Sequence, residues 1–83
     1  LIDNGSEKPL HIDVKAFSFP IEIVRLFPNR GIAGYNVGFE KSAADVLIAV
    51  DSDVTLAPST LQVLADAFAR NPELVFAGAQ IID

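Results

Sequence analysis

Two aspartates follow an apolar run in the stretch VLIAVDSDVTLAP, which covers residues 46–58. If the chain stays extended there, Asp51 and Asp53 point to the same side, because the side chains of a strand alternate between its faces. Neighbouring carboxylates repel each other, and a divalent cation removes that repulsion. Carboxylate oxygens suit Mg²⁺ or Mn²⁺, which complete their coordination shells with phosphate oxygens and water. The pair therefore predicts a site for phosphate-bound Mg²⁺ or Mn²⁺, and a simple turn built from both aspartates is the alternative.

Hydrophobic periodicity predicts the elements that position this pair. The first expected strand ends at Asp3, and the other expected strands cover 21–27, 45–50 and 74–82. The expected helices cover 7–19, 33–44 and 58–70, although 7–19 fits the alternation of a strand equally well. Strands and helices that alternate along a chain predict a layered α/β fold with parallel pairing. Ligands of such folds bind at the carboxyl ends of the strands, which is where the aspartate pair would lie.

Glycines mark the turns and one close approach. Asn4-Gly5-Ser6 predicts a turn after the first strand, and 29–31 predicts another after the second. Gly34 and Gly38 lie inside the predicted helix 33–44, where a glycine costs about 1 kcal/mol relative to alanine. Glycines retained at that cost indicate that this helix lies close to another part of the chain.

The composition excludes several functional classes. The 83 residues are 51% hydrophobic and 20% charged, which predicts a globular chain and not a disordered one. The net charge of −5 gives no basic surface for nucleic acid, and Arg25 and the other basic residues are scattered like solvated surface charges. The absence of cysteine excludes disulfides and thiolate metal sites, which suits a reducing compartment.

The apolar runs and the chain ends bear on location and completeness. No run approaches the roughly 20 residues of a membrane span. We therefore expect a cytoplasmic protein, with the inner face of a membrane as a second location. The chain begins without Met and ends on the apolar stretch FAGAQIID, so we expect 1–83 to be a fragment of a longer polypeptide.

Nearly the whole chain resembles the nucleotide-sugar glycosyltransferases of the large inverting GT-A family, the group 2 type. The resemblance rests on LIDNGS and on FPNRGIAGYNVGFEKSAADVLIAVDSDVTLAPSTLQVLADAFARNPELVFAG. Its motifs are a DNGS turn after a strand, an NRG…NxG helix start, a DxD strand end, a helix opened by proline and an NPE stop. It implies a partial Rossmann-like α/β/α fold with a mostly parallel sheet. Residues 1–83 would form the nucleotide-sugar-binding part, without the first strand and the acceptor half.

The resemblance also implies roles for individual residues. Asp3 matches the aspartate that hydrogen-bonds the nucleotide base. Asp51 matches the first aspartate of the DxD motif, which faces the ribose and sugar and is a second candidate metal ligand. Asp53 matches the second aspartate, which binds the metal at the diphosphate. The other residues implied at the nucleotide-sugar pocket are Asn4, Arg30, Gly31 and Asn36.

The implied reaction transfers a sugar from a nucleoside-diphosphate sugar to a hydroxyl of a carbohydrate or lipid-linked acceptor. A cation at the diphosphate would stabilise the negative charge that develops on the leaving group. The carboxylate base of this family lies in the acceptor half, so we expect the catalytic base outside 1–83.

Two other functions remain open at this point. DSDVTL also matches the signature of haloacid-dehalogenase-like phosphatases, in which Asp51 would be the nucleophile and Asp53 the acid/base. That signature normally opens its domain, whereas about fifty residues precede it here. The chain could also be a non-catalytic structural or binding fragment. For the glycosyltransferase fragment, we expect the isolated chain to be inactive and to oligomerise through the strand edges that the missing first strand leaves unpaired.

Overall fold

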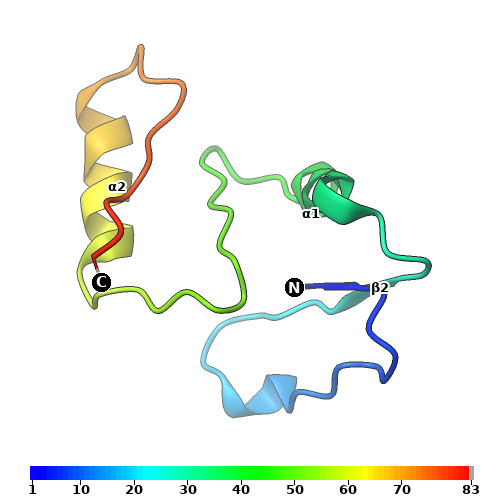
Figure 1. Ribbon diagram of the computed structural model, residues 1–83. Coiled ribbons are helices and arrows are strands. Elements are labelled where there is room, and N and C mark those ends of the chain that lie inside the picture. The colour runs from blue at the N-terminus through cyan, green and yellow to red at the C-terminus, as the bar shows by residue number, and fades with distance from the viewer. Residues whose placement is uncertain (83) are drawn as a thin grey trace. The chain divides into compact units, whose positions relative to one another are not determined.

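The computed structural model describes residues 1–82 and divides into two units, one of residues Leu1–Leu47 and a second that begins at Ile48 (Figure 1). The first unit contains strands β1 (Ile2–Asn4) and β2 (Val24–Leu26), the 3₁₀ turns η1 (Val14–Ala16) and η2 (Gly31–Ala33), and helix α1 (Gly34–Lys41). The second unit contains helix α2 (Thr60–Arg70).

The two strands of the first unit pair in parallel, as the alternation of elements predicted. Asp3 lies opposite Arg25, and Asn4 lies opposite Leu26. Parallel pairing places the carboxyl ends of both strands at the same edge of the sheet. The DNGS turn that follows β1 and the NRG turn that follows β2 therefore start side by side.

Helix α1 lies against β1 through its two glycines. A Cβ built on Gly34 would lie 2.8 Å from Asn4 Nδ2, and one built on Gly38 would lie 3.6 Å from Ile2 Cγ1. Gly34 therefore has no room for a side chain, while Gly38 has ordinary contact space. The predicted close approach is confirmed.

Helix α2 confirms the prediction for 58–70. Ser59 precedes its first residue, and Leu64 and Phe68 on its apolar face are half-buried. Asn71 ends the helix, because its backbone N–H and its Nδ2 both donate to the carbonyl oxygen of Ala67, at 3.2 and 2.9 Å. The Asn-Pro stop read from the sequence is thus a side-chain cap of the last turn.

Three predicted elements are wrong. Segments 45–50 and 74–82 are irregular, because neither pairs with another strand among residues 1–82 and a strand needs a neighbour for its backbone groups. Most of their apolar side chains are exposed, and Phe76 is 85% exposed. Segment 7–19 is irregular except for η1, since Leu10 N–H donates to Asp3 and the Asp13 side chain accepts from Lys15 N–H. Short polar side chains that bond to nearby backbone in this way compete with helix formation.

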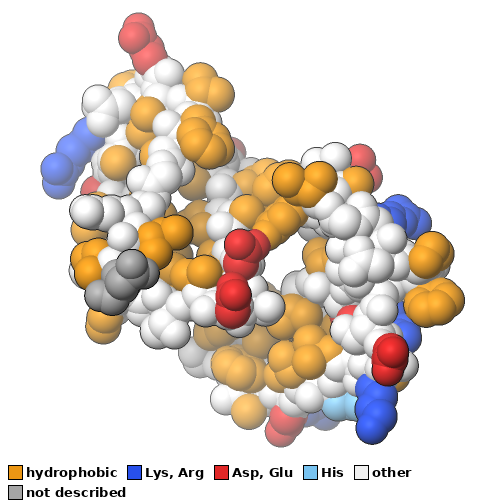
Figure 2. All heavy atoms as spheres, viewed as in Figure 1, with side chains coloured by type: hydrophobic (Ala, Val, Ile, Leu, Met, Phe, Trp, Pro, Cys, Tyr) orange, Lys and Arg blue, Asp and Glu red, His pale blue; other side chains and the backbone are white. Residues whose placement is uncertain are grey.

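The core described by residues 1–82 is small. Leu26 is its buried hydrophobic residue and Asp3 its buried charged one. Hydrophobic side chains reach the surface over both units (Figure 2). Within the described residues, no helix is long and apolar enough to cross a membrane.

Candidate functional site

A cluster of polar groups lies at the carboxyl ends of β1 and β2, and the Asp3 carboxylate is its buried member. The side chain of Asp3 is only 2% exposed. Oδ1 accepts a hydrogen bond from Ser6 N–H at 3.2 Å, and Oδ2 accepts one from Leu10 N–H at 2.9 Å. Buried carboxylates persist only when they are paired and hydrogen-bonded, and these contacts meet that condition.

Arg25 supplies the positive charge for this carboxylate. Its Nη1 donates to Asp3 Oδ2 at 3.2 Å, and its Nη2 donates to the carbonyl oxygen of Ser6 at 2.9 Å. The contact follows from the register of the parallel pair, in which Asp3 and Arg25 are direct neighbours. One guanidinium therefore ties β2 to both the end of β1 and the loop after it.

These contacts lower the pKa of Asp3 below its ordinary value of 3.8. The hydrogen bond from the Ser6 side chain contributes most, followed by the Leu10 N–H, the Ser6 N–H and the charge of Arg25, while burial acts in the opposite direction. Hydrogen bonds and a nearby cation favour the charged form of a carboxyl group. Asp3 is thus an ionised acceptor at neutral pH.

Asn4 joins the loop after β1 to the turn after β2. Its Oδ1 accepts from Arg30 N–H at 2.8 Å, and its Nδ2 donates to the carbonyl oxygen of Gly31 at 2.9 Å. The side-chain amide therefore accepts from one backbone group of this turn and donates to another, as a neighbouring strand does in a sheet. The structure brings together Asp3, Asn4, Arg30 and Gly31, four of the residues that the resemblance placed at the nucleotide.

Two glycines make this arrangement possible. Gly5 has φ +80° and Gly31 has φ +58°, in the left-handed region that favours glycine. A Cβ on Gly5 would lie 2.6 Å from the backbone nitrogen of Asn29, so the two turns contact each other backbone to backbone. The backbone N–H of Gly31 is held by Asn29 Oδ1 at 2.6 Å.

Asn36 lies near this cluster along the chain and is exposed on α1. It is two residues after Gly34, which contacts Asn4. Asn36 is thus on the helix that packs against the cluster, and the structure gives it no part in the hydrogen bonds described above.

Asp51 and Asp53 belong to the second unit. Val54 N–H donates to the carbonyl oxygen of Asp51 at 3.1 Å, which closes a four-residue turn with Asp53 inside it. The expectation that the chain stays extended through the pair is therefore wrong. The two aspartates thus lie on a tight turn and not on one face of a strand, and both residues are exposed.

A protein cage for a metal ion needs several donor side chains that lie together. Residues 1–82 contain no group of three or more acidic, histidine or cysteine side chains placed to hold an ion. The turn at 51–54 nevertheless carries two exposed aspartates, and Mg²⁺ commonly takes one or two carboxylates with phosphate oxygens and water as its other ligands. These residues fit a cation that arrives with a phosphorylated ligand, and they do not form a closed metal cage.

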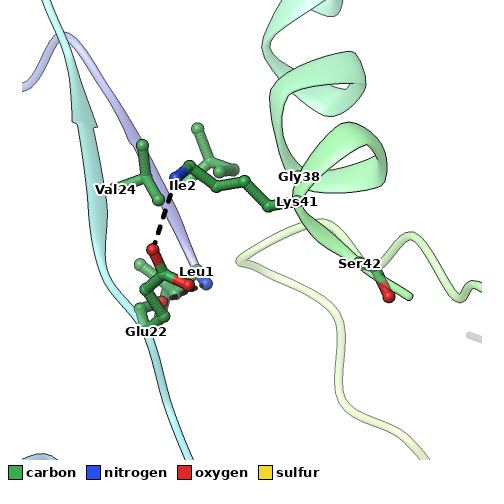
Figure 3. A pocket seen from close by; sticks show the side chains of 7 residues that line it. All are labelled: Leu1, Ile2, Glu22, Val24, Gly38, Lys41 and Ser42. Carbon is green, nitrogen blue, oxygen red and sulfur yellow. Dashed lines mark hydrogen bonds and ion pairs between the residues drawn. The ribbon is translucent and has the colours of Figure 1, made fainter. Parts of the chain in front are cut away.

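A separate hollow of about 190 Å³ lies at the opposite end of the strands (Figure 3). Ile2 and Val24 line it from the amino ends of β1 and β2, and Lys41 extends across it from α1 to Glu22 with an Nζ–Oε1 distance of 3.4 Å. Parallel α/β folds bind ligands at the carboxyl ends of their strands, so this hollow lies away from the expected site.

Sequence reasoning missed Arg25, which was expected to be a solvated surface charge. The signal that could have found it is the spacing of strand ends. If the strands that end in DNGS and FPNRG pair in parallel, then Asp3 and Arg25 are opposite charges at adjacent positions.

The family model of glycosyl transferase family 2 matches residues 1–83, the entire chain. No curated protein and no solved structure matches the chain.

Proposed function

The chain belongs to glycosyl transferase family 2, and from this premise we propose that its protein transfers a sugar from a nucleoside-diphosphate sugar to an acceptor hydroxyl with help from Mg²⁺ or Mn²⁺. Family membership implies the GT-A fold, and the parallel strand pair and the helices agree with that fold. It also implies glycosyl transfer at the level of the family. The nucleotide contacts, the metal and the acceptor, a carbohydrate or a lipid-linked molecule, are the proposal.

The observation that carries the proposal is the polar cluster at the carboxyl ends of β1 and β2. Asn4 fixes the turn 29–31 beside the loop 4–6, so that two glycine-containing loops lie next to each other. Glycine loops at this end of parallel strands allow a nucleotide to approach the backbone closely. The cluster is therefore proposed to hold the nucleoside of the donor.

Asp3 is proposed to accept a hydrogen bond from the nucleotide base. Its carboxylate is covered by the segment 6–10, through the N–H groups of Ser6 and Leu10. Contact with the base thus requires this segment to open and a base N–H to replace Leu10 N–H at Oδ2. That exchange replaces one neutral donor by another, so it leaves the carboxylate satisfied.

Asp51 and Asp53 are proposed to serve the diphosphate. A cation there would offset the charge that the departing nucleoside diphosphate gains in the transition state. The chain's own contribution is to present two carboxylates on a turn closed by the Val54 N–H. Arg30, Gly31 and Asn36 are proposed to border the donor from the side of α1.

Isothermal titration calorimetry on the full-length protein tests this assignment. Wild type and two charge-removing variants, Asp53→Asn and Glu73→Gln, are titrated with UDP, GDP, CDP and ADP, each with and without Mg²⁺ or Mn²⁺. Glu73 is an exposed carboxylate of the same unit and serves as the matched control.

We expect one nucleotide to bind with metal, Asp53→Asn to lose about tenfold or more in affinity, and Glu73→Gln to bind like wild type. Binding that needs no metal and is unchanged in Asp53→Asn would contradict the assignment of Asp53.

A further inference from the structure

Arg25 joins three parts of the polar cluster through one guanidinium group. Asp3 Oδ1 holds the backbone N–H of Ser6 at 3.2 Å, and Arg25 Nη2 holds the carbonyl oxygen of the same residue at 2.9 Å. Arg25 Nη1 also holds Asp3 Oδ2 at 3.2 Å. Both backbone groups of Ser6 are therefore fixed by this ion pair.

We propose that Arg25 is a positioning residue for donor binding, which holds the Asp3 carboxylate and the loop 4–6 in the arrangement that the nucleotide base requires. This inference rests on the proposed function, because it assigns Arg25 to the same donor site.

A second ion pair of this unit provides a comparison. Lys41 and Glu22 lie at the amino ends of the strands, 3.4 Å apart, and their side chains are 48% and 70% exposed. The Asp3 side chain, in contrast, is 2% exposed. Exposed ion pairs contribute little, whereas removing one partner of a buried pair leaves a charge without compensation. The Arg25 side chain is itself 36% exposed, but the carboxylate it holds is buried, so this pair is the one that can control the geometry of its surroundings.

Arg25 also explains how Asp3 could exchange its partners. When Leu10 N–H leaves Oδ2, the guanidinium remains bound to the same oxygen and keeps the carboxylate oriented. The two bonds of Arg25 use the planar fork of its guanidinium. A lysine would keep the charge at this position, but its single ammonium cannot hold Asp3 and Ser6 in the same geometry.

The test measures nucleotide affinity and donor kinetics in the full-length protein. Arg25→Ala and Arg25→Lys are compared with wild type and with Lys41→Ala, which removes the exposed ion pair of the same unit. Each variant is titrated with the diphosphate that wild type binds best, with Mg²⁺ present. The titration is repeated with a few millimolar guanidinium, and thermal unfolding of each variant is recorded.

We expect Arg25→Ala to bind the nucleotide about tenfold or more weakly, because charge-assisted bonds to a buried carboxylate are lost. We expect KM for the donor to rise more than kcat falls, Arg25→Lys to be intermediate, and guanidinium to restore part of the affinity of Arg25→Ala. Lys41→Ala should stay within about twofold of wild type, since exposed pairs contribute little.

Arg25→Ala that binds within twofold of wild type would overturn the inference, and so would a loss of affinity shared equally by Lys41→Ala. If Arg25→Ala shows no unfolding transition, Arg25→Lys decides: weakened binding in a folded variant supports the role, and unchanged binding refutes it. Wild type that binds none of the nucleotides would refute the proposed function, and this inference with it.

Discussion

Gly34 and Asn4 form a contact whose energy can be isolated by a double-mutant cycle. The change Gly34→Ala places a Cβ 2.8 Å from Asn4 Nδ2 and 3.2 Å from Asn4 Cγ. The end of a flexible side chain could move away at little cost, but this one is held at both ends by the bonds to Arg30 N–H and the Gly31 carbonyl. The alanine therefore displaces the Asn4 side chain and breaks both bonds.

The magnitude follows from two opposing effects. Each hydrogen bond contributes about 0.5–1.5 kcal/mol net, so losing both costs about 1–3 kcal/mol. Replacing glycine by alanine in a helix gains up to about 1 kcal/mol. Gly34→Ala should thus destabilise the wild type by about 0–3 kcal/mol. In the Asn4→Ala background there is nothing left to displace, so the same change should stabilise by up to about 1 kcal/mol.

Urea unfolding followed by circular dichroism gives the four free energies of this cycle. We expect a coupling energy of about 1–3 kcal/mol between the two sites. Gly38→Ala is the control, because its Cβ would meet Ile2 Cγ1 at an ordinary 3.6 Å and it should show no coupling to Asn4. A Gly34→Ala change that has the same sign and size in both backgrounds would refute the packing described for α1.

Three further outcomes are expected from the same unit and its ligand. The pKa of Asp3 is lowered in the folded chain, so its stabilising effect is present above the unfolded value of 3.8 and is lost as the pH falls through the lowered pKa. In urea unfolding, the difference in free energy of unfolding between wild type and Asp3→Asn should therefore narrow below pH 3.8. A difference that stays constant with pH would contradict this. Gly5→Ala should destabilise by about 1–3 kcal/mol in thermal unfolding, because of φ +80° and a 2.6 Å contact with Asn29 N, while Gly78→Ala, which meets nothing within 4 Å, should change little. Asp3→Asn should weaken nucleotide binding in calorimetry more than Asp45→Asn, an exposed aspartate of the same unit, and equal effects would remove Asp3 from the base site.

The elements that could be predicted from the sequence are those specified by local pattern. The apolar face of 60–70 and the Asn-Pro stop gave helix α2, and the β-branched run around Val24 gave β2. The DNGS turn followed from its residue types, since Gly5 takes the left-handed backbone there. In each case the residue types that signal the element lie close together along the chain.

The elements that could not be predicted depend on distant partners. Leu10 has the spacing of a helical residue, but its N–H is taken by Asp3, seven residues earlier. Segments 45–50 and 74–82 have the composition of strands, yet a strand forms only where a neighbour pairs with it. Arg25 gained its role from the register of β1 against β2, which periodicity does not specify.

In the candidate site, too, the motifs predicted the arrangement of some residues and not of others. Asp3, Asn4, Arg30 and Gly31 were read from motifs and are brought together at one strand edge. For Asp51 and Asp53 the motif gave the residues but the wrong local geometry, because the Val54 N–H closes a turn that strand alternation could not reveal.

The most direct test of the central claim, that the nucleotide binds at the carboxyl ends of β1 and β2, is an amide NMR titration of the full-length protein. The nucleoside diphosphate that wild type binds best in calorimetry is added with Mg²⁺, and the chemical-shift changes are mapped onto the sequence. We predict the largest changes at the two loops, 4–6 and 29–31, and at the turn 51–54. Changes confined to the hollow around Ile2, Val24 and Lys41, with the loops unaffected, would contradict the account.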